Sequence, residues 1–384
     1  MTPERVTGDW LSHPATQAVC KALGEAGYTA YFVGGCVRNA LMGAPVSDID
    51  ISTNAVPSVT MEIAQAAGFH AIPTGIDHGT ITVVAKGIAH EITTYRKDVA
   101  TDGRRAVVAF AETIEQDALR RDFTMNALYA DRHGDVLDPL GGFGDLEQRR
   151  VRFIQDAHKR IQEDYLRTLR FFRFNAWYGD AEHGLDEDAL DAIAQNLEGL
   201  DRLSKERVTA EILKLLSAPD PAPSLAAMRA TGVLARVLPS ANDRNFALLV
   251  HHEQDLGLDP NPIRRLAALC PSLGQADLRL SNAERKRFDL LVDGQSNVIP
   301  PHELGYRLGL EPALDVLVLR ATLFETEVPH GGVLDAQLGT KANFPIAARD
   351  LMPHYSGPDL GHKMRELEGH WITSKFTLGK DDLL

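Results

Sequence analysis

Residues 28–38 read Tyr-Thr-Ala-Tyr-Phe-Val-Gly-Gly-Cys-Val-Arg, and residues 47–52 read Ser-Asp-Ile-Asp-Ile-Ser. Aromatic and β-branched side chains over residues 28–33 predict a strand that runs directly into the glycine pair. A short helix is expected over residues 36–42, and Gly43 ends it. Residues 47–52 alternate polar and apolar side chains, which predicts a second, half-buried strand.

The glycine pair lies where the first predicted strand gives way to a helix. Gly34 and Gly35 let the backbone approach a ligand closely, and the start of the helix offers free N–H groups. Arg38 adds a fork of donors suited to phosphate. These features would suit a triphosphate, although a tight strand-to-helix turn without a ligand explains an isolated glycine pair at least as well.

Two acidic side chains follow on the second predicted strand. Residues two apart on a strand face the same side, so Asp48 and Asp50 project together while Ile49 and Ile51 point into the core. Paired carboxylates of this kind are hard oxygen ligands that suit Mg²⁺ bridged to a substrate phosphate. A solvated strand face is the plainer alternative, and the glycine pair just upstream favours the metal.

The rest of the amino-terminal part mixes strand and helix signals. Helices are predicted over residues 14–27 and 57–67, strands over 69–72, 80–85, 89–95 and 106–110, and a polar, mobile loop over 97–105. Glu91 lies in one of these strands and is a candidate third carboxylate for two-metal phosphoryl transfer. Helical patterns dominate from residue 159 onward. We therefore predict an α+β fold with an all-helical remainder.

Composition restricts the class of protein. The 384 residues are 44% hydrophobic and 24% charged, which predicts a folded chain with more than one core. No signal peptide and no apolar run long enough for a membrane are visible, so the cytoplasm is the expected compartment. The three cysteines, Cys20, Cys36 and Cys270, lack metal-ligand spacing. The net charge of −13 argues against nucleic acid, but residues 149–173 carry eight basic and three acidic side chains and form a local basic stripe.

Four sequence motifs occur in order along the chain. They are Gly34-Gly35-Cys36-Val37-Arg38, Asp48-Ile49-Asp50, Arg120-Arg121-Asp122-Phe123-Thr124-Met125-Asn126-Ala127-Leu128 and Glu163-Asp164-Tyr165-Leu166-Arg167-Thr168-Leu169-Arg170. This series resembles the class II tRNA nucleotidyltransferases, the CCA-adding enzymes grouped with bacterial poly(A) polymerases. The resemblance covers residues 31–173, under half of the chain. Asn39 departs from it, because the family more often has Asp there.

The resemblance implies a DNA polymerase β-type nucleotidyltransferase head with a mixed sheet. It implies a catalytic head over residues 1–148, a helical neck that selects the base over 149–216, and a helical body and tail that bind tRNA over 217–384. Asp48 and Asp50 would be ligands of Mg²⁺, with Glu91 as the third carboxylate. The implied nucleotide-binding residues are Gly34, Gly35, Arg38 and Arg121 at the triphosphate, Asp122 and Asn126 at the sugar, and Asp164, Arg167, Arg170 and Arg173 on the neck.

Asp164 and Arg167 are the expected base-selecting pair. Cytosine and adenine both present an amino donor beside a ring-nitrogen acceptor, which a carboxylate and a guanidinium match; guanine and uracil reverse that order. Three residues apart on a helix they are neighbours, so an ordinary i,i+3 ion pair that stabilises the helix is the plainer alternative. Arg170 and Arg173 continue at the same spacing and spiral away, toward phosphate or RNA.

The expected function is addition of C, C and A to the tRNA 3′ end from CTP and ATP without a nucleic-acid template, with release of pyrophosphate. The expected partners are tRNA, CTP and ATP, with no membrane and no protein partner. The loop over residues 98–105 matches the family's flexible element for switching from CTP to ATP, and an ordinary surface loop is an equal alternative. Rival functions are a poly(A) polymerase, a CC-only adding enzyme and, from another class, a catalytically silent RNA-binding protein.

Overall fold

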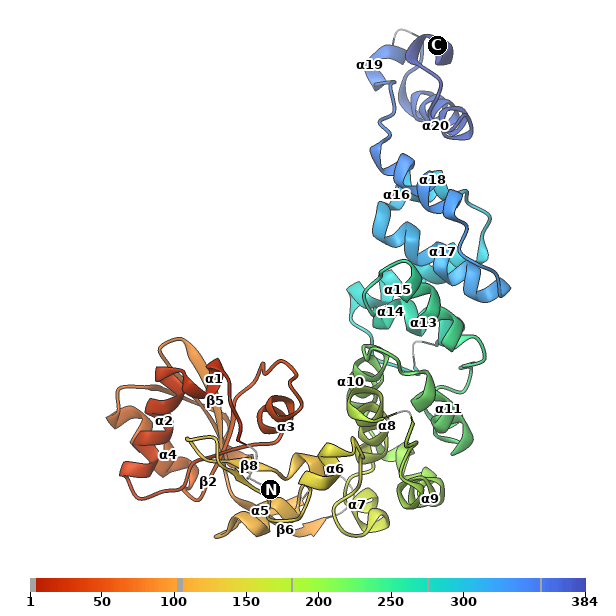
Figure 1. The fold of residues 1–384 in the computed structure, drawn as a ribbon. Helices are drawn as coiled ribbons and strands as arrows, with labels where there is room; N and C mark the ends of the chain where they lie inside the picture. Colours follow the sequence, from red (N-terminus) through yellow and green to blue (C-terminus); the bar gives the residue numbers. More distant parts are fainter. Residues whose placement is uncertain (1–4, 102–105, 181, 275, 353) are drawn as a thin grey trace. The chain divides into compact units, whose positions relative to one another are not determined.

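The computed structural model describes residues 5–101, 106–180, 182–274, 276–352 and 354–384. The chain forms two compact units (Figure 1). Unit 1 extends to Glu211 and takes in Pro223–Val237, whereas unit 2 comprises Ile212–Ala222 and Leu238–Leu384. Each unit is described by itself below.

A seven-stranded mixed sheet organises the first part of unit 1. Its strand order is β3-β4-β5-β2-β1-β8-β9, and β2 and β5 pair in parallel while the other neighbours are antiparallel. The strands are β1 (Tyr31–Val33), β2 (Asp50–Thr53), β3 (His70–Gly75), β4 (Thr80–Ala85), β5 (Ile88–Thr94), β8 (Tyr129–Ala130) and β9 (Val136–Leu137). The predicted α+β class is confirmed.

Helices cover the sheet and bury its apolar side chains. They are α1 (Asp9–Ser12), α2 (Pro14–Glu25), α3 (Gly35–Leu41), α4 (Pro57–Ala66) and α5 (Ile114–Leu119). Helices α2 and α4 both pack on β4 and β5, and they lie on the same side of the sheet in Figure 1. Phe32, Ile51 and Ile92, one from each of three neighbouring strands, are almost fully buried. The alternation in β2 therefore places Asp50 on the face opposite this core.

The structure corrects two expectations about strands. The strand predicted over residues 47–52 begins only at Asp50, so Asp48 lies in the segment that precedes it. The loop predicted over residues 97–105 is wrong in its first half, because Arg96–Thr101 forms β6 and pairs antiparallel with β7 (Ala106–Phe110). Backbone pairing with β7 satisfies this segment whatever the polarity of its side chains. Residues 102–105 lie outside the described residues.

The helical remainder of unit 1 starts after β9. It contains α6 (Phe143–Glu147), α7 (Ala157–Glu163), α8 (Leu166–Tyr178), α9 (Glu187–Gln195), the start of α10 (Lys205–Leu216), most of α11 (Ala222–Ala230) and α12 (Val233–Val237), with 3₁₀ segments at Thr124–Asn126 and Leu197–Arg202. Phe123 and Phe153 stack with Phe171 and Phe174 of α8, at centroid distances of 4.9–6.4 Å. This aromatic core fixes α8 against the segment around residue 123.

Unit 2 is helical throughout its described part. Its helices are α13 (Phe246–Asp255), α14 (Pro262–Leu269), α15 (Asn282–Ser296), α16 (Pro301–Leu308), α17 (Leu310–Phe324), α18 (His330–Lys341), α19 (Ala348–Leu351), α20 (Gly357–Thr373) and α21 (Lys380–Leu383). This confirms the helical carboxy-terminal part expected from the sequence. A search of the described helices finds none with the length and apolar character needed to cross a membrane.

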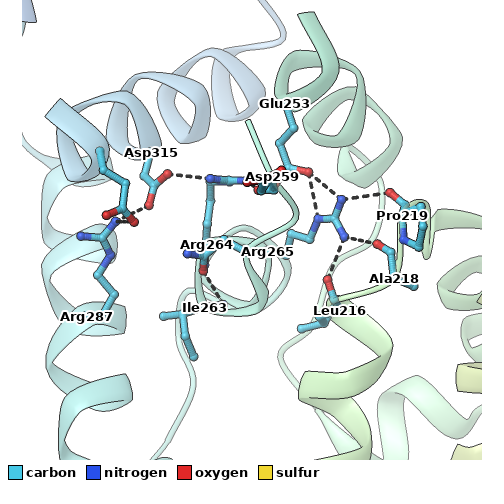
Figure 2. A network of polar contacts seen from close by, with 12 residues as sticks. Leu216, Ala218, Pro219, Glu253, Asp259, Ile263, Arg264, Arg265, Arg287 and Asp315 are labelled. Carbon is cyan, nitrogen blue, oxygen red and sulfur yellow. Dashed lines mark hydrogen bonds and ion pairs between the residues drawn. The ribbon is translucent and has the colours of Figure 1, made fainter. Parts of the chain in front are cut away.

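A buried ion-pair network holds α13, α14 and α17 together (Figure 2). Glu253 accepts from Nε of Arg264 at 2.7 Å and from Nε and Nη2 of Arg265 at 2.9 and 2.7 Å. Arg264 also donates to Asp315 at 2.7 Å, and all four side chains are at most 3% exposed. Arg265 further donates to the backbone carbonyls of residues 216, 218 and 219, which ties the end of α10 to this network.

We expect Glu253→Ala and Glu253→Gln to destabilise unit 2 by about 3–5 kcal/mol, because each leaves two buried guanidinium groups short of a counter-charge. Native-state hydrogen exchange of the α13 and α14 amides measures the change locally. His251→Ala is the matched control, since His251 lies on the same helix with an exposed side chain. If the Glu253→Gln variant were as stable as wild type, the charge of Glu253 would be dispensable.

Candidate functional site

The glycine turn places backbone close to two guanidinium groups. Gly34 has φ +71°, and a Cβ atom there would lie 3.4 Å from Nη1 of Arg121. Gly35 is the first residue of α3, and a Cβ atom there would lie 3.8 Å from Nη2 of Arg38. The positive φ is one that side-chain-bearing residues rarely adopt. The turn is therefore a tight one beside concentrated positive charge.

Two acidic residues meet across the parallel strand pair. Asp50 of β2 is in register with Glu91 of β5, and the Glu91 amide donates to the carbonyl of Ile49 at 2.9 Å. Burial and then the Glu91 carboxylate raise the pKa of Asp50 to about 6, although Arg121 opposes the shift. Asp48 adds to the repulsion and is itself exposed. The ionised form of Asp50 is therefore disfavoured, first by burial and then by the two acidic neighbours, even with Arg121 nearby.

The donor set fits a hard divalent cation that is completed by substrate. Among the described residues, no three His, Cys, Asp or Glu side chains are gathered as a complete metal site. Mg²⁺ is usually held by one or two carboxylates together with phosphate oxygens and water, so an all-protein cage is not required. Asp48 and Asp50 supply carboxylates of that kind, and burial followed by the charge of Glu91 disfavours the ionised form of Asp50, which a bound cation would favour.

Arg121 is anchored by a carboxylate that sequence reasoning missed. Asp117 is fully buried and accepts from Nη2 of Arg121 at 3.1 Å and from Nε of Arg120 at 2.8 Å. The hydroxyls of Ser52 and Tyr129 donate to the same carboxylate at 3.0 and 2.8 Å. Burial raises the pKa of Asp117, but Arg121 and Arg120 outweigh it and hold the pKa well below its usual range. Asp117 is therefore a permanent anion that fixes Arg121.

A chain of hydrogen bonds joins the predicted sugar-binding residues. Asp122 accepts from the side-chain amide of Asn126 at 3.0 Å and from Nε of Arg170 at 2.7 Å. Asn126 in turn accepts from Nη1 of Arg38 at 2.6 Å. The structure thus brings together four of the residues predicted from the motifs. Asp122 and Asn126 are buried, so their orientation is set before any ligand arrives.

Arg38 is more enclosed than expected. Its guanidinium is 3.9 Å from the centre of the Tyr178 ring and donates to the Tyr178 hydroxyl at 2.8 Å. It also donates to the Asn39 side chain through Nε and Nη2. Burial lowers the pKa of Arg38. Of the five N–H groups of an arginine, four are used here within the protein, which leaves at most one for a triphosphate.

The expected base-selecting residues are placed differently from the prediction. Asp164 and Arg167 were predicted as neighbours on one helix, but Asp164 lies at the break between α7 and α8. Asp164 pairs with Arg207 at 2.7 Å. Arg167 pairs with Glu163 at 2.5 Å and donates to the carbonyl of Arg120 at 2.9 Å. The i,i+3 ion pair is absent because a helix break and two other partners intervene.

Most of the basic stripe is neutralised inside unit 1. Five arginines between residues 149 and 173 form ion pairs: Arg152 with Asp145, Arg160 and Arg167 with Glu163, Arg170 with Asp122 and Arg173 with Glu211. Arg149, Arg150 and Lys159 are exposed. Arg170 and Arg173 also flank the ring of Phe174, 5.4 and 4.7 Å from its centre. These two arginines thus serve first to orient carboxylates.

Sequence reasoning missed Asp117, Tyr178, Arg207 and Glu211. Asp117 lies on α5, three and four residues before Arg120 and Arg121, a spacing that brings side chains together on a helix. The other three contact their partners across 38 to 140 residues. Nothing local in the sequence marks such contacts.

Two family models match the chain. The model described as the poly A polymerase head domain matches residues 30–152, and the model described as a probable RNA and SrmB-binding site of polymerase A matches residues 184–244. Both matches lie within the part of the chain that carries unit 1 and its junction to unit 2.

Curated relatives and a solved structure match over most of the length. The chain is 40% identical to a CCA-adding enzyme of Lactobacillus delbrueckii subsp. bulgaricus over 92% of this chain and 93% of that protein. It is 33% identical to the mitochondrial CCA tRNA nucleotidyltransferase 1 of Mus musculus over 91% and 84%. The crystal structure of the Bacillus stearothermophilus CCA-adding enzyme in complex with CTP is similar at a TM-score of 0.72 and 29% identity, covering 94% and 93%.

Unit 1 is expected to lose stability in acid through Asp122. Burial raises the pKa of Asp122, but the Arg170 charge and the Asn126 hydrogen bond outweigh it and lower the pKa to about 2. A lowered carboxyl pKa contributes stability above the unfolded value, near pH 4, that is lost as the pH falls toward 2. Between pH 4 and pH 2, the free energy of unfolding of wild type should therefore fall by on the order of 2 kcal/mol more than that of Asp122→Asn. Urea denaturation at each pH measures it.

Asp188→Asn serves as the control for this comparison, because Asp188 is an exposed carboxylate of the same unit. Its pH profile should follow that of wild type. Parallel profiles for wild type and Asp122→Asn would contradict the pairing described for Asp122.

Proposed function

This chain belongs to the family of CCA-adding enzymes, and from that premise we propose that it adds C, C and A to the 3′ end of tRNA from CTP and ATP. One observation supports this proposal above the others. The register of β2 and β5 gathers Asp50 and Glu91 beside Arg121 and the glycine turn. Carboxylates that can bind a metal ion therefore lie next to guanidinium groups that can bind phosphate. A nucleoside triphosphate with its metal carries both charges that this arrangement lacks.

The acidic face would hold the metal. Asp48 and Asp50 are the ligands we assign to Mg²⁺, and Glu91 is the third carboxylate of the same face. When bound, Mg²⁺ supplies activation of the attacking tRNA 3′-hydroxyl and neutralisation of charge on the leaving pyrophosphate. The protein contributes the fixed placement of these carboxylates by the paired strands.

The triphosphate would lie against the glycine turn. Gly34 and Gly35 leave room for phosphate oxygens next to the backbone, and Arg121 presents a charge already oriented by Asp117. Such preorganised charge needs no rearrangement as negative charge develops in the transition state. Arg38, by contrast, would act mainly by holding Asn126, which with Asp122 would orient the sugar.

Asp164 and Arg167 would select the base. The carboxylate accepts from the amino group of cytosine or adenine, and the guanidinium donates to the adjacent ring nitrogen. Guanine and uracil present the reverse order, which leaves buried groups unpaired at about 1–3 kcal/mol each. Their separate partners in the structure leave both side chains oriented independently of one another. We assign this selection to a neck over residues 149–216.

We further assign tRNA binding to residues 217–384, following a catalytic head over residues 1–148. The family model for a probable RNA-binding site supports an RNA contact beginning within residues 184–244. Helical surfaces that recognise a duplex do so largely through its shape and backbone.

A poly(A) polymerase is the second candidate, because the model that matches residues 30–152 is named for that activity. Extension of tRNAs lacking CCA, CA or A, resolved to single nucleotides, separates the two. We expect growth with CTP and ATP to stop after a complete CCA. An ATP-only ladder well past one residue would instead identify a poly(A) polymerase, and a stop at CC would identify a CC-only enzyme.

Asp50→Asn is expected to stabilise the metal-free protein while abolishing activity. The raised pKa means that folding disfavours the ionised carboxyl group, so a neutral side chain at pH 7.5 removes the cost of burying the charge and the repulsion with Glu91. Thermal unfolding without metal should shift upward by roughly 2–4 °C. Added Mg²⁺ should raise the midpoint of wild type and leave that of Asp50→Asn unchanged.

The control is Glu62→Gln, an exposed carboxylate on α4 that should behave as wild type in both measurements. Equal stabilisation of Asp50→Asn and wild type by Mg²⁺ would place the metal elsewhere.

A further inference from the structure

Among the described residues, the Asp164 carboxylate accepts two hydrogen bonds, one at each oxygen. Oδ1 accepts from the backbone amide of Leu166 at 3.1 Å, at the start of α8. Oδ2 accepts from Nη2 of Arg207, near the start of α10, at 2.7 Å. Each carboxylate oxygen has two lone pairs, so each keeps one acceptor site for a ligand. The Asp164 side chain is 29% exposed and hence open to one.

The backbone around Asp164 is held separately from its side chain. The ring of the next residue, Tyr165, lies against the backbone of Gly199, where a Cβ atom would come within 1.9 Å of the ring. The guanidinium of Arg202 is 5.6 Å from the centre of the same ring. These contacts fix where the Asp164 Cα lies. They do not fix the rotation of the carboxyl group, which has a broad torsional preference of its own.

We propose that Arg207 is a specificity-determining positioning residue that holds the Asp164 carboxylate in the orientation that accepts the amino group of cytosine or adenine. This inference rests on the proposed function. Without Arg207, the carboxylate would keep the hydrogen bond from the Leu166 amide and be free to turn toward the Arg167 guanidinium, three residues further along the chain. A carboxylate paired with Arg167 would occupy both halves of the base-reading pair.

The geometry also explains why an arginine stands at this position. Its planar fork can bind one carboxylate oxygen while the remaining N–H groups stay directed away, and a guanidinium carries only donors, which complement the acceptor oxygens of a carboxylate. Lysine supplies the charge without the fork. Lysine should therefore restore part of the orientation, whereas alanine should restore none.

The test compares nucleotide discrimination in Arg207→Ala, Arg207→Lys and wild type. On tRNA lacking CCA, we expect Arg207→Ala to raise the KM for CTP and to lower the CTP-over-UTP ratio of kcat/KM about tenfold, the effect of one lost or misdirected hydrogen bond. Arg207→Lys should recover part of that ratio. Asp164→Ala should lose at least as much, and the double variant Asp164→Ala with Arg207→Ala should be no worse than Asp164→Ala alone, since the two residues act through one contact.

Arg236→Ala is the matched control. Arg236 pairs with Asp201 in the same unit across 35 residues, with side-chain exposure of 40% against 37% for Arg207. It should leave the CTP-over-UTP ratio at the wild-type value. A merely structural Arg207 would lower the thermal midpoint and kcat for all nucleotides together while keeping the ratio.

Two results would overturn the inference. One is an unchanged CTP-over-UTP ratio in Arg207→Ala. The other is a lower KM for CTP, which would show that Arg207 competes with the base for Asp164. Titration of CTP and UTP binding without tRNA repeats the comparison independently of chemistry. Wild-type enzyme that discriminates in binding but adds no nucleotides would refute the proposed function and leave the inference standing.

Discussion

The parallel pairing of β2 and β5 is the constraint on which the arrangement of the candidate site depends. This pairing sets the carboxylates of Asp50 and Glu91 side by side, and their residual negative charge is what raises the pKa of Asp50 after burial. Arg121 opposes this shift, and buried Asp117 and the Tyr129 hydroxyl hold its guanidinium in place. Asp117 also accepts a hydrogen bond from Ser52, two residues beyond Asp50 on the same strand. Asp117 therefore links the Arg121 guanidinium to the strand that carries Asp50.

Pairing of a carboxylate with an arginine recurs in the part of the chain that carries the candidate site. Asp122 is oriented by Arg170, Asp164 by Arg207 and Glu211 by Arg173. In each pair a carboxylate from one segment meets an arginine from another. The pairs therefore join the sheet-bearing part of unit 1 to α8 and α10 while fixing acceptor groups. In unit 2 a similar pairing stabilises the fold. Glu253 pairs with the buried Arg264 and Arg265, and Arg265 also donates to the backbone carbonyl of Leu216 at the end of α10.

Local sequence signals predicted the elements and the motif residues but not their partners. Alternation in residues 47–52 placed Ile49 and Ile51 in the core and Asp50 opposite them, because strand periodicity is a local property. Polar side chains led to the wrong prediction of a loop over residues 97–101, which belong to β6. A strand's backbone pairing is decided by the neighbouring strand rather than by its own side chains. Helical spacing failed for Asp164, where an extended backbone (φ −153°) interrupts the pattern. The roles of Tyr178 and Arg207 could not be predicted from local sequence, because the residues they contact are 140 and 43 positions away along the chain.

The acidic net charge of the chain is consistent with this use of arginine. A protein that bound RNA mainly by charge would leave its arginines exposed, yet five of those between residues 149 and 173 are paired within unit 1. These five arginines hold carboxylates as oriented acceptors, and the paired carboxylates offset much of their charge. Discrimination between bases depends on the direction of hydrogen bonds, which such orientation supplies and bare charge does not. We thus assign selection of the nucleotide to arginines paired with carboxylates, and attraction of the nucleic acid to the exposed basic residues Arg149, Arg150 and Lys159.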